Sequence, residues 1–179
     1  MKGQDIYILL KLVCLHQNPH GSGSDHFSAR GLSAALGVSK TEVNASIRRS
    51  IDVGLAIKDR ESGYPKANKR ALLEFVVHGL KYVFPAKPAE ITRGVPTAFS
   101  APMLQKELSS MGDYIPVWPW AEGEQKGQAV PPLFKTVPKA ALHDNRLYEL
   151  LALTDAIRLG NSRESKLAAA LFQQRLLND

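Results

Sequence analysis

A glycine between two short amphipathic stretches limits the fold of this chain more than any other feature. Leu32 and Leu36 lie one helical turn apart, so the first stretch has a single apolar row. Gly37 follows, and glycine adopts the left-handed backbone of a sharp turn without a steric penalty. Residues 28–55 therefore predict a short helix, a tight turn and a second helix.

The second helix has a clear start and a predicted buried side. Ser39 is a favourable N-cap, and Glu42 three residues later completes the pattern of a capping box. Val43, Ile47 and Ile51 recur at helical spacing and form the row expected to face inward.

The outer side of this second helix is expected to be polar and basic. It carries Lys40, Thr41, Asn44, Ala45, Arg48 and Arg49. Side chains of these types donate to phosphates and hydrogen-bond base edges in the major groove, although most exposed arginines only solvate a helix face. We therefore expect double-stranded DNA to be contacted by Ser39, Lys40, Thr41, Asn44, Arg48 and Arg49.

The run Leu-Ser-Ala-Ala-Leu-Gly-Val-Ser-Lys-Thr-Glu-Val at 32–43, with Asp52-Val-Gly-Leu-Ala-Ile-Lys58 after the basic helix, resembles the winged helix-turn-helix regulators. This broad group includes MarR-like transcription factors, and the resemblance covers about residues 5–84. It implies an outgoing strand at 55–58 and a basic wing tip at 59–63. Lys58 and Arg60 are the DNA-contacting residues expected there.

The chain departs from that pattern where the wing should return. Pro65 lies at the start of the expected second strand, and a helical pattern follows almost at once. We therefore expect a wing that is short or lacks a regular second strand.

The charge distribution agrees with a DNA-binding N-terminal part. The net charge is +6 for the whole chain, and counting by segment gives +5 for 1–84, +1 for 85–141 and zero for 142–179. Neutralisation of phosphates dominates nonspecific affinity for DNA, so this asymmetry is expected of a DNA-binding protein. Because many enzymes are as basic, charge alone does not carry the prediction.

The pattern along the chain predicts three parts. The predicted fold class is mainly α with minor β. Residues 1–84 form the winged helix-turn-helix domain, with an opening helix and a helix over 68–83. Residues 85–141 hold nine of the eleven prolines, interleaved with apolar residues, which predicts an ordered irregular segment with edge strands near 114–120 and 128–134 around a turn at 122–127. Residues 142–179 predict a C-terminal helical hairpin.

The terminal helices are expected to form a homodimer. The opening helix has apolar residues on more than one side, and the C-terminal hairpin is rich in leucine. A monomer would expose this surface to water, whereas a two-fold dimer would bury it. Such a dimer would suit a palindromic DNA site.

Other function classes have weaker support. The chain lacks a phosphate-binding glycine loop, a nucleophile elbow and a metal-finger spacing, so we expect no enzyme, no cofactor and no metal site. His16, His20 and His26 have no accompanying ligands at a metal-binding spacing. The alternative is a protein-interaction module, antitoxin-like or adaptor, that holds a second protein through the helical core and Trp118 and Trp120.

The expected location is the cytoplasm. Cys14 is the only cysteine, which excludes an intramolecular disulfide and indicates a reducing compartment. No long apolar run or signal-peptide pattern is present, so neither a membrane span nor export is expected.

Overall fold

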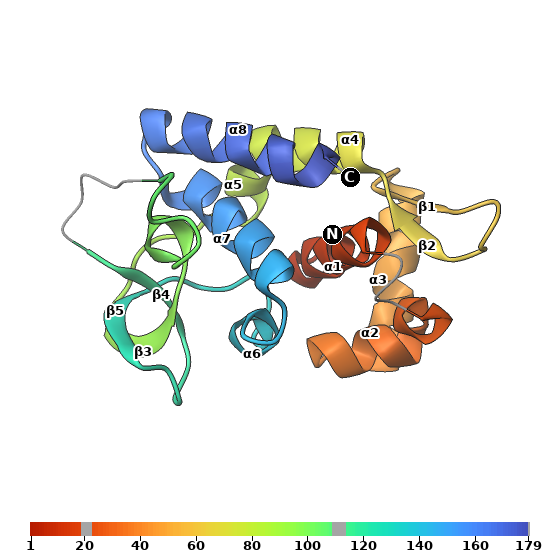
Figure 1. Cartoon of the computed structure of the whole chain (residues 1–179), viewed down its shortest axis with the longest axis horizontal. Helices are drawn as coiled ribbons and strands as arrows, with labels where there is room; N and C mark the ends of the chain where they lie inside the picture. The colour runs from red at the N-terminus through yellow and green to blue at the C-terminus, as the bar shows by residue number, and fades with distance from the viewer. Residues whose placement is uncertain (19–22, 109–113, 179) are drawn as a thin grey trace.

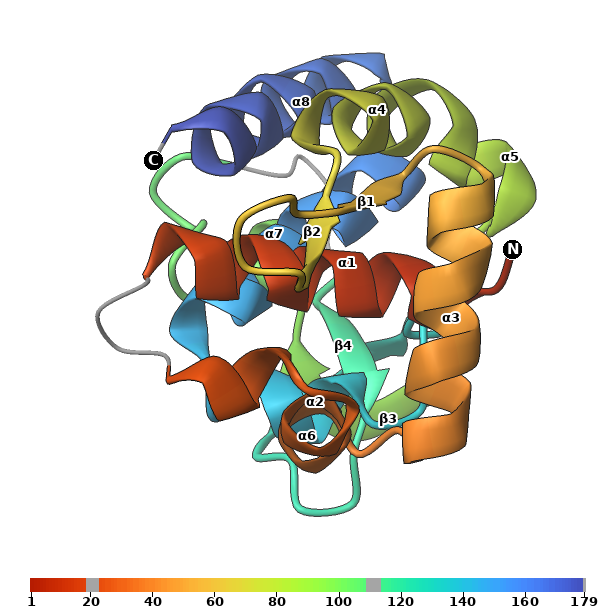
Figure 2. The ribbon, with the colours of Figure 1, turned by 90° about the vertical axis from the view of Figure 1, so that its right-hand side faces the viewer.

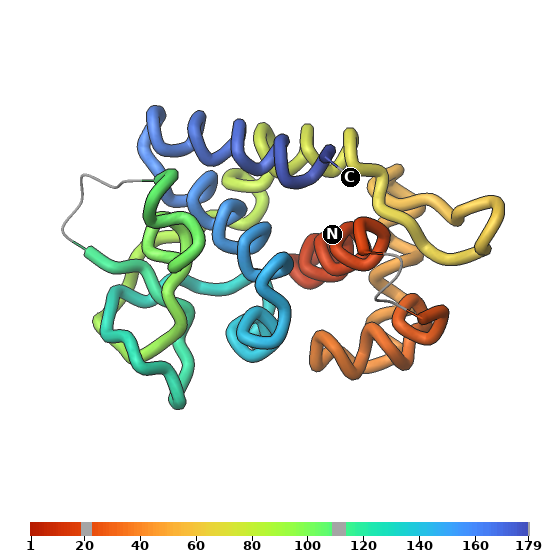
Figure 3. Tube along the Cα trace, viewed as in Figure 1, coloured from red at the N-terminus to blue at the C-terminus, as the bar shows by residue number. Residues whose placement is uncertain are grey.

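The computed structural model describes residues 1–18, 23–108 and 114–178. With 56% helix and 12% strand, it confirms a mainly α chain with minor β structure. A small three-stranded sheet lies at one end of the molecule and a two-stranded hairpin at the other (Figures 1 and 3). Within these ranges no helix combines the length and apolar character needed to cross a bilayer.

Helix α1 (Gly3–Gln17) is the centre of the packing. Its residues 4–10 and 12–15 are all buried, and it contacts α3, β2 and α7, which lie on different sides of it. The chain therefore covers the apolar surface of α1 by itself. Our expectation that a monomer would leave this surface exposed is wrong.

The predicted pair of helices around Gly37 is confirmed. A short 3-10 turn, η2 (Ser24–Phe27), leads into α2 (Ala29–Leu36), and α3 (Lys40–Asp52) follows after the turn. Gly37 has a φ of 65°, in the left-handed region that favours glycine.

The predicted buried row of α3 is only partly correct. Val43 is buried and Ile47 is partly buried, but Ile51 is 41% exposed. Ser46 and Ser50 take the buried positions instead, on the face that packs against α1. Small side chains at these two positions let the helices approach closely, which the apolar pattern does not reveal.

The hairpin after α3 has a regular second strand. We expected a wing that is short or lacks such a strand, and the second of these alternatives is wrong. Strands β1 (Ala56–Lys58) and β2 (Pro65–Ala67) pair antiparallel, with Lys58 opposite Pro65. Pro65 is the first residue of its strand, where proline is tolerated.

Aromatic residues fix the start of β2 to the C-terminal end of α1. Phe27 stacks on Tyr64 with ring centroids 5.3 Å apart, and His16 lies 4.7 Å from Phe27. His16 Nε2 also donates to the Pro65 carbonyl at 3.1 Å.

One continuous helix follows the hairpin, with a π-helical turn in its middle. It comprises α4 (Lys69–Glu74), the π turn η3 (Phe75–Gly79) and α5 (Leu80–Val83). It ends at Val83, as the sequence predicts, with Phe84 as its C-cap before Pro85. Helix α4 lies beside α8 (Figures 1 and 2).

The proline-rich segment folds into a three-stranded sheet in which each strand pairs with both others. Strands β3 (Ile91–Pro96), β4 (Pro116–Pro119) and β5 (Gln125–Ala129) close on themselves, with β4 and β5 parallel and the other pairs antiparallel. Glycine makes this closure possible, because a Cβ on Gly94 would collide with the Trp118 carbonyl.

Our strand predictions here were partly wrong. The 114–120 range contains β4, but β5 overlaps the expected 128–134 strand only at 128–129 and takes up part of the expected turn at 122–127. Strand β3 was not predicted. Prolines at the strand ends and glycines within the strands hide the usual alternation of branched apolar residues.

The C-terminal helices complete the core. After the short turn η4 (Ala98–Ser100) and α6 (Val137–Ala141), α7 (Asn145–Leu159) and α8 (Ser162–Leu177) form the predicted helical hairpin. Residues 150–157 of α7 are all buried, and α8 buries Ala168, Phe172 and Leu176. A single apolar cluster spans the three parts expected from the sequence. Both the division into those parts and the homodimer stay predictions.

A buried ion pair within α7 is hydrogen-bonded to three other parts of the chain. The Asp155 carboxylate accepts hydrogen bonds from Thr97 Oγ1 at 2.9 Å and Trp118 Nε1 at 2.6 Å, and it pairs with Arg158 at 2.7 Å. Arg158 Nε donates to the Phe84 carbonyl at 2.9 Å. Burial raises the pKa of Asp155, while the three donors oppose that shift.

We predict that Asp155→Ala lowers the free energy of unfolding by about 3–5 kcal/mol, because it leaves Arg158 buried without its partner. Urea titration followed by circular dichroism measures this. The control is Asp52→Ala at an exposed position of α3, expected within about 0.5 kcal/mol of the parent. Equal stability of the two variants would show that the Asp155 network contributes little.

Candidate nucleic-acid interface

An exposed polar stripe runs along the outer side of α3. Lys40, Thr41, Asn44 and Arg48 are all exposed and lie on successive turns. None of these four side chains has a hydrogen bond or an ion pair with another described residue. Helix α3 lies at the edge of the molecule, so this side is uncovered (Figure 2).

Ser39 begins α3 as predicted, but the capping box is only half formed. Its hydroxyl accepts the Glu42 N–H at 3.3 Å. The Glu42 carboxylate does not return to Ser39; it accepts hydrogen bonds from Lys2, Gln4 and Arg49 instead. Ser39 remains exposed beside Lys40.

Arg49 does not belong to the exposed stripe, and its predicted outward position is wrong. Its guanidinium donates to both carboxylate oxygens of Asp5, at 3.1 Å from Nε and 2.7 Å from Nη2. Nη2 also donates to Glu42 at 2.8 Å. Arg49 therefore joins α3 to the N-terminal end of α1. The helical pattern could not show this, because the acidic partner lies in another helix.

The charges in this network stabilise one another. Asp5 is completely buried, and it also accepts the Lys2 backbone N–H at 2.8 Å. Burial alone would raise the pKa of Asp5, but the bonds from Arg49 and Lys2 outweigh it and hold the pKa below the ordinary value. The hydrogen bond from Arg49 likewise lowers the pKa of Glu42.

The two expected hairpin contacts lie apart from the α3 stripe. Lys58 and Arg60 are exposed at the end of β1 and in the tip, where Asp59 accepts the Ser62 N–H at 2.9 Å. Helix α3 packs at the N-terminal half of α1, whereas the tip reaches the other end of α1 (Figure 2). The structure thus brings four predicted contacts together on α3 and separates these two from them.

Trp118 is not available as a protein contact. It is 1% exposed, and its indole N–H is bonded to Asp155. Trp120 is partly buried against the core. The alternative of a protein-interaction module therefore loses one of the two residues on which we based it.

The three N-terminal histidines lie in different surroundings. His16 bonds the Pro65 carbonyl, His26 is exposed, and His20 lies outside the described residues. Within the described ranges, no three His, Cys, Asp or Glu side chains are grouped as metal ligands.

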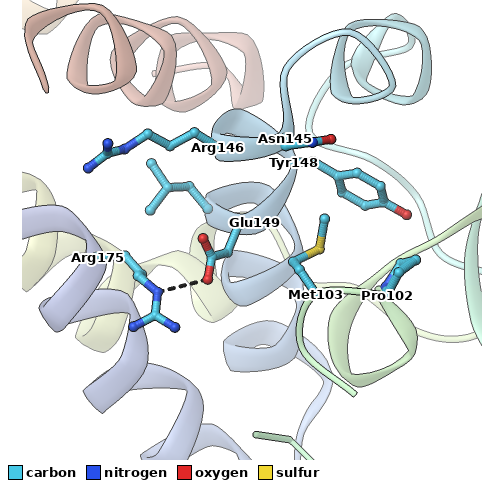
Figure 4. Close-up of a pocket in the computed structure, with 8 residues that line it drawn as sticks. Pro102, Met103, Asn145, Arg146, Tyr148, Glu149 and Arg175 are labelled. Atoms are coloured by element: carbon cyan, nitrogen blue, oxygen red, sulfur yellow. Dashed lines mark hydrogen bonds and ion pairs between the residues drawn. The ribbon is translucent and has the colours of Figure 1, made fainter. Parts of the chain in front are cut away.

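A cavity that the sequence did not suggest opens between α7, α8 and the 102–103 segment (Figure 4). Its volume is about 810 Å³, and it is lined by Pro102, Met103, Asn145, Arg146, Tyr148, Glu149, Leu150 and Arg175. Arg175 pairs with Glu149 and Glu107, each at 2.8 Å, so its charge is already balanced. The lining contains no serine, cysteine or histidine.

Comparison of the chain with protein-family models, curated proteins and solved structures finds no match.

We predict opposite consequences for the two neighbouring arginines of α3. Arg49→Ala should lower the free energy of unfolding by about 2–3 kcal/mol, because it leaves the buried Asp5 carboxylate unpaired; the loss is discounted because Arg49 is 29% exposed. Arg48→Ala should change it by less than about 0.5 kcal/mol. Urea titration of both variants decides the matter, and equal stabilities would contradict the assigned roles.

The same network predicts a pH dependence. Since the folded-state pKa of Asp5 lies below its ordinary value of 3.8, its contribution to stability is present above that value and is lost as pH falls through the lowered pKa. In Arg49→Ala the unpaired, buried carboxyl should favour its protonated form. The stability difference between parent and variant should therefore be largest near neutrality and shrink as the pH falls below about 4. A constant difference between pH 7 and pH 3 would contradict this.

Proposed function

We propose that the chain is a sequence-specific double-stranded DNA-binding transcriptional regulator of the winged helix-turn-helix type, with α3 as its recognition helix. The observation that carries the proposal is the exposed stripe of Lys40, Thr41, Asn44 and Arg48, whose side chains have no partner among the described residues. Unpaired donors on one helix face are suited to a polyanion with patterned base edges.

The dimensions and support of α3 agree with this role. Thirteen residues give a helix of about 20 Å, which fits along a major groove about 12 Å wide. The order of three helices followed by a two-stranded hairpin agrees with a winged helix-turn-helix. The Asp5–Arg49 pair fixes α3 to the buried α1, so the exposed stripe is presented on a rigid element.

Each residue has a proposed task. Lys40 and Arg48 donate to phosphates, and Thr41 and Asn44 bond base edges. Lys58 and Arg60 in the hairpin contact the DNA backbone at a place separate from α3. Ser39 caps α3, and its neighbouring backbone N–H groups favour an approaching phosphate.

One observation favours the protein-interaction alternative. Ile51, Val53 and Ile57 are 41%, 59% and 49% exposed at the C-terminal end of α3 and in β1. Exposed apolar residues close together are typical of protein contacts. Loss of a protein partner, with DNA affinity unchanged, on replacing Val53 by Ser would support this second candidate.

The proposed regulator acts as a homodimer, because two recognition helices one DNA turn apart, about 34 Å, read a palindromic site. We predict that the intact chain sediments at twice its 19.6 kDa mass. A monomer at tens of micromolar would remove the dimer and the palindromic site, but not the α3 contacts.

We predict that Arg48→Ala weakens binding to duplex DNA and reduces the slope of log affinity against log salt by about one unit, because one phosphate contact is lost. Fluorescence anisotropy across a salt series measures both quantities. Lys166→Ala on α8 is the matched control and should change neither. A folded Arg48→Ala protein with the parental affinity and slope would refute the proposed role of α3.

Asn44→Ala tests base reading. An asparagine amide can form two hydrogen bonds with adenine, so the variant should lose about 1–3 kcal/mol on duplexes selected from random sequence by the parent protein. On unselected duplexes it should lose little. Equal losses on both kinds of DNA would exclude a base-reading role for Asn44.

A further inference from the structure

A groove with basic residues and no acidic ones lies next to the turn that precedes α3. It runs between the C-terminal half of α2 and α6 and has a volume of about 400 Å³. Its lining consists of Ala34, Ala35, Leu36, Gly37, Thr136, Lys139, Ala140 and His143. Helix α6 belongs to the proline-rich segment, which the sequence did not connect with DNA.

Hydrogen bonds from the start of α6 and from α1 meet at the end of α2. The Leu36 carbonyl accepts from Thr136 Oγ1 at 2.6 Å and from the Tyr7 hydroxyl at 3.2 Å. Gly37 packs so closely that a Cβ there would lie 3.0 Å from Thr136 Cγ2. The position of α6 relative to α2 and the start of α3 is therefore set by direct contacts.

The walls of this groove are small and its charge is positive. Ala34, Ala35 and Gly37 are exposed on the α2 side, so no long side chain blocks approach. Lys139 is exposed on the α6 side, and its ammonium group has no acidic partner in the part of the chain that the structure describes. These features suit a large anion that lies along an open groove better than a small ligand that must be enclosed.

The chemistry of His143 assigns the main contact to Lys139. His143 Nδ1 lies 2.8 Å from the Lys139 carbonyl, which can only accept, so Nδ1 carries the proton. This bond occupies the Nδ1 proton, so His143 cannot offer it to a phosphate. Lys139 carries three donors and a full charge.

We propose that this groove between α2 and α6 holds backbone phosphates of the bound DNA, with Lys139 as the donor. The inference rests on the proposed function. In helix-turn-helix complexes the second helix enters the major groove while the first crosses the backbone, and α2 occupies the place of that first helix. A groove along α2, next to the start of α3, then lies where the DNA strand passes. The DNA-binding surface thus extends from residues 1–84 to α6.

The experiment compares two exposed lysines on different helices. Lys139→Gln and Lys166→Gln each remove one exposed charge from a helix, and α8 lies on the opposite edge of the molecule from α2 and α6 (Figure 1). Affinity for selected and for unselected duplexes is measured by anisotropy between about 50 and 200 mM salt. Thermal unfolding verifies that each variant is folded.

We predict that Lys139→Gln reduces the salt slope by about one unit and weakens binding by the same factor on both kinds of duplex, as expected for a phosphate contact. Lys166→Gln should match the parent. A second variant, Ala35→Glu, places a carboxylate on the α2 wall and should weaken binding further without removing a lysine.

The groove proposal would be overturned if both Lys139→Gln and Ala35→Glu kept the parental salt slope and affinity while Arg48→Ala still lost affinity. The proposed role of α3 would then stand. Failure of the parent protein to bind either kind of duplex would refute the proposed function and the groove together. Loss on selected duplexes alone would assign Lys139 to a base edge and overturn the phosphate contact.

Discussion

The burial of α1 along most of its length is the constraint on which the other elements depend. Helix α3, the hairpin strand β2 and α7 all pack against it, so the part expected to bind DNA and the C-terminal hairpin share one helix as their common wall. Such a helix needs apolar residues on every side, as the consecutive buried residues Tyr7, Ile8 and Leu9 show. Movement of α1 would therefore displace α3 and α7 together.

Two buried carboxylates hold this arrangement at separate places, and each is paired with an arginine. Asp5 and Arg49 join α1 to α3, while Asp155 and Arg158 join α7 to the three-stranded sheet and to the end of the helix over 69–83. A buried ion pair adds little stability compared with apolar packing, but the loss of one partner is costly. Pairs of this kind favour one relative placement of the helices over others.

The sequence was most informative where a local rule sets the structure. Gly37, Ser39 and the helix over 69–83 follow from backbone preference, capping and periodicity, each of which acts within a few residues. Prediction from the sequence failed where contacts between residues far apart in the chain set the structure. The partner of Arg49 lies in another helix, and Ile51 is exposed because α1 packs over Ser46 and Ser50 instead. The lysine of α6 could not be associated with α2 before the fold was known.

The π turn at Phe75–Gly79 has a consequence for how one helix serves two neighbours. A π turn contains about one residue more than an α turn, so the residues after it are rotated by roughly 100° around the axis relative to an uninterrupted α-helix. Before the turn, α4 contacts α8; after it, α5 contacts α7. The extra residue rotates the apolar face of the second half of the helix. One helix can therefore pack against both α8 and α7, which a single straight apolar stripe could not do.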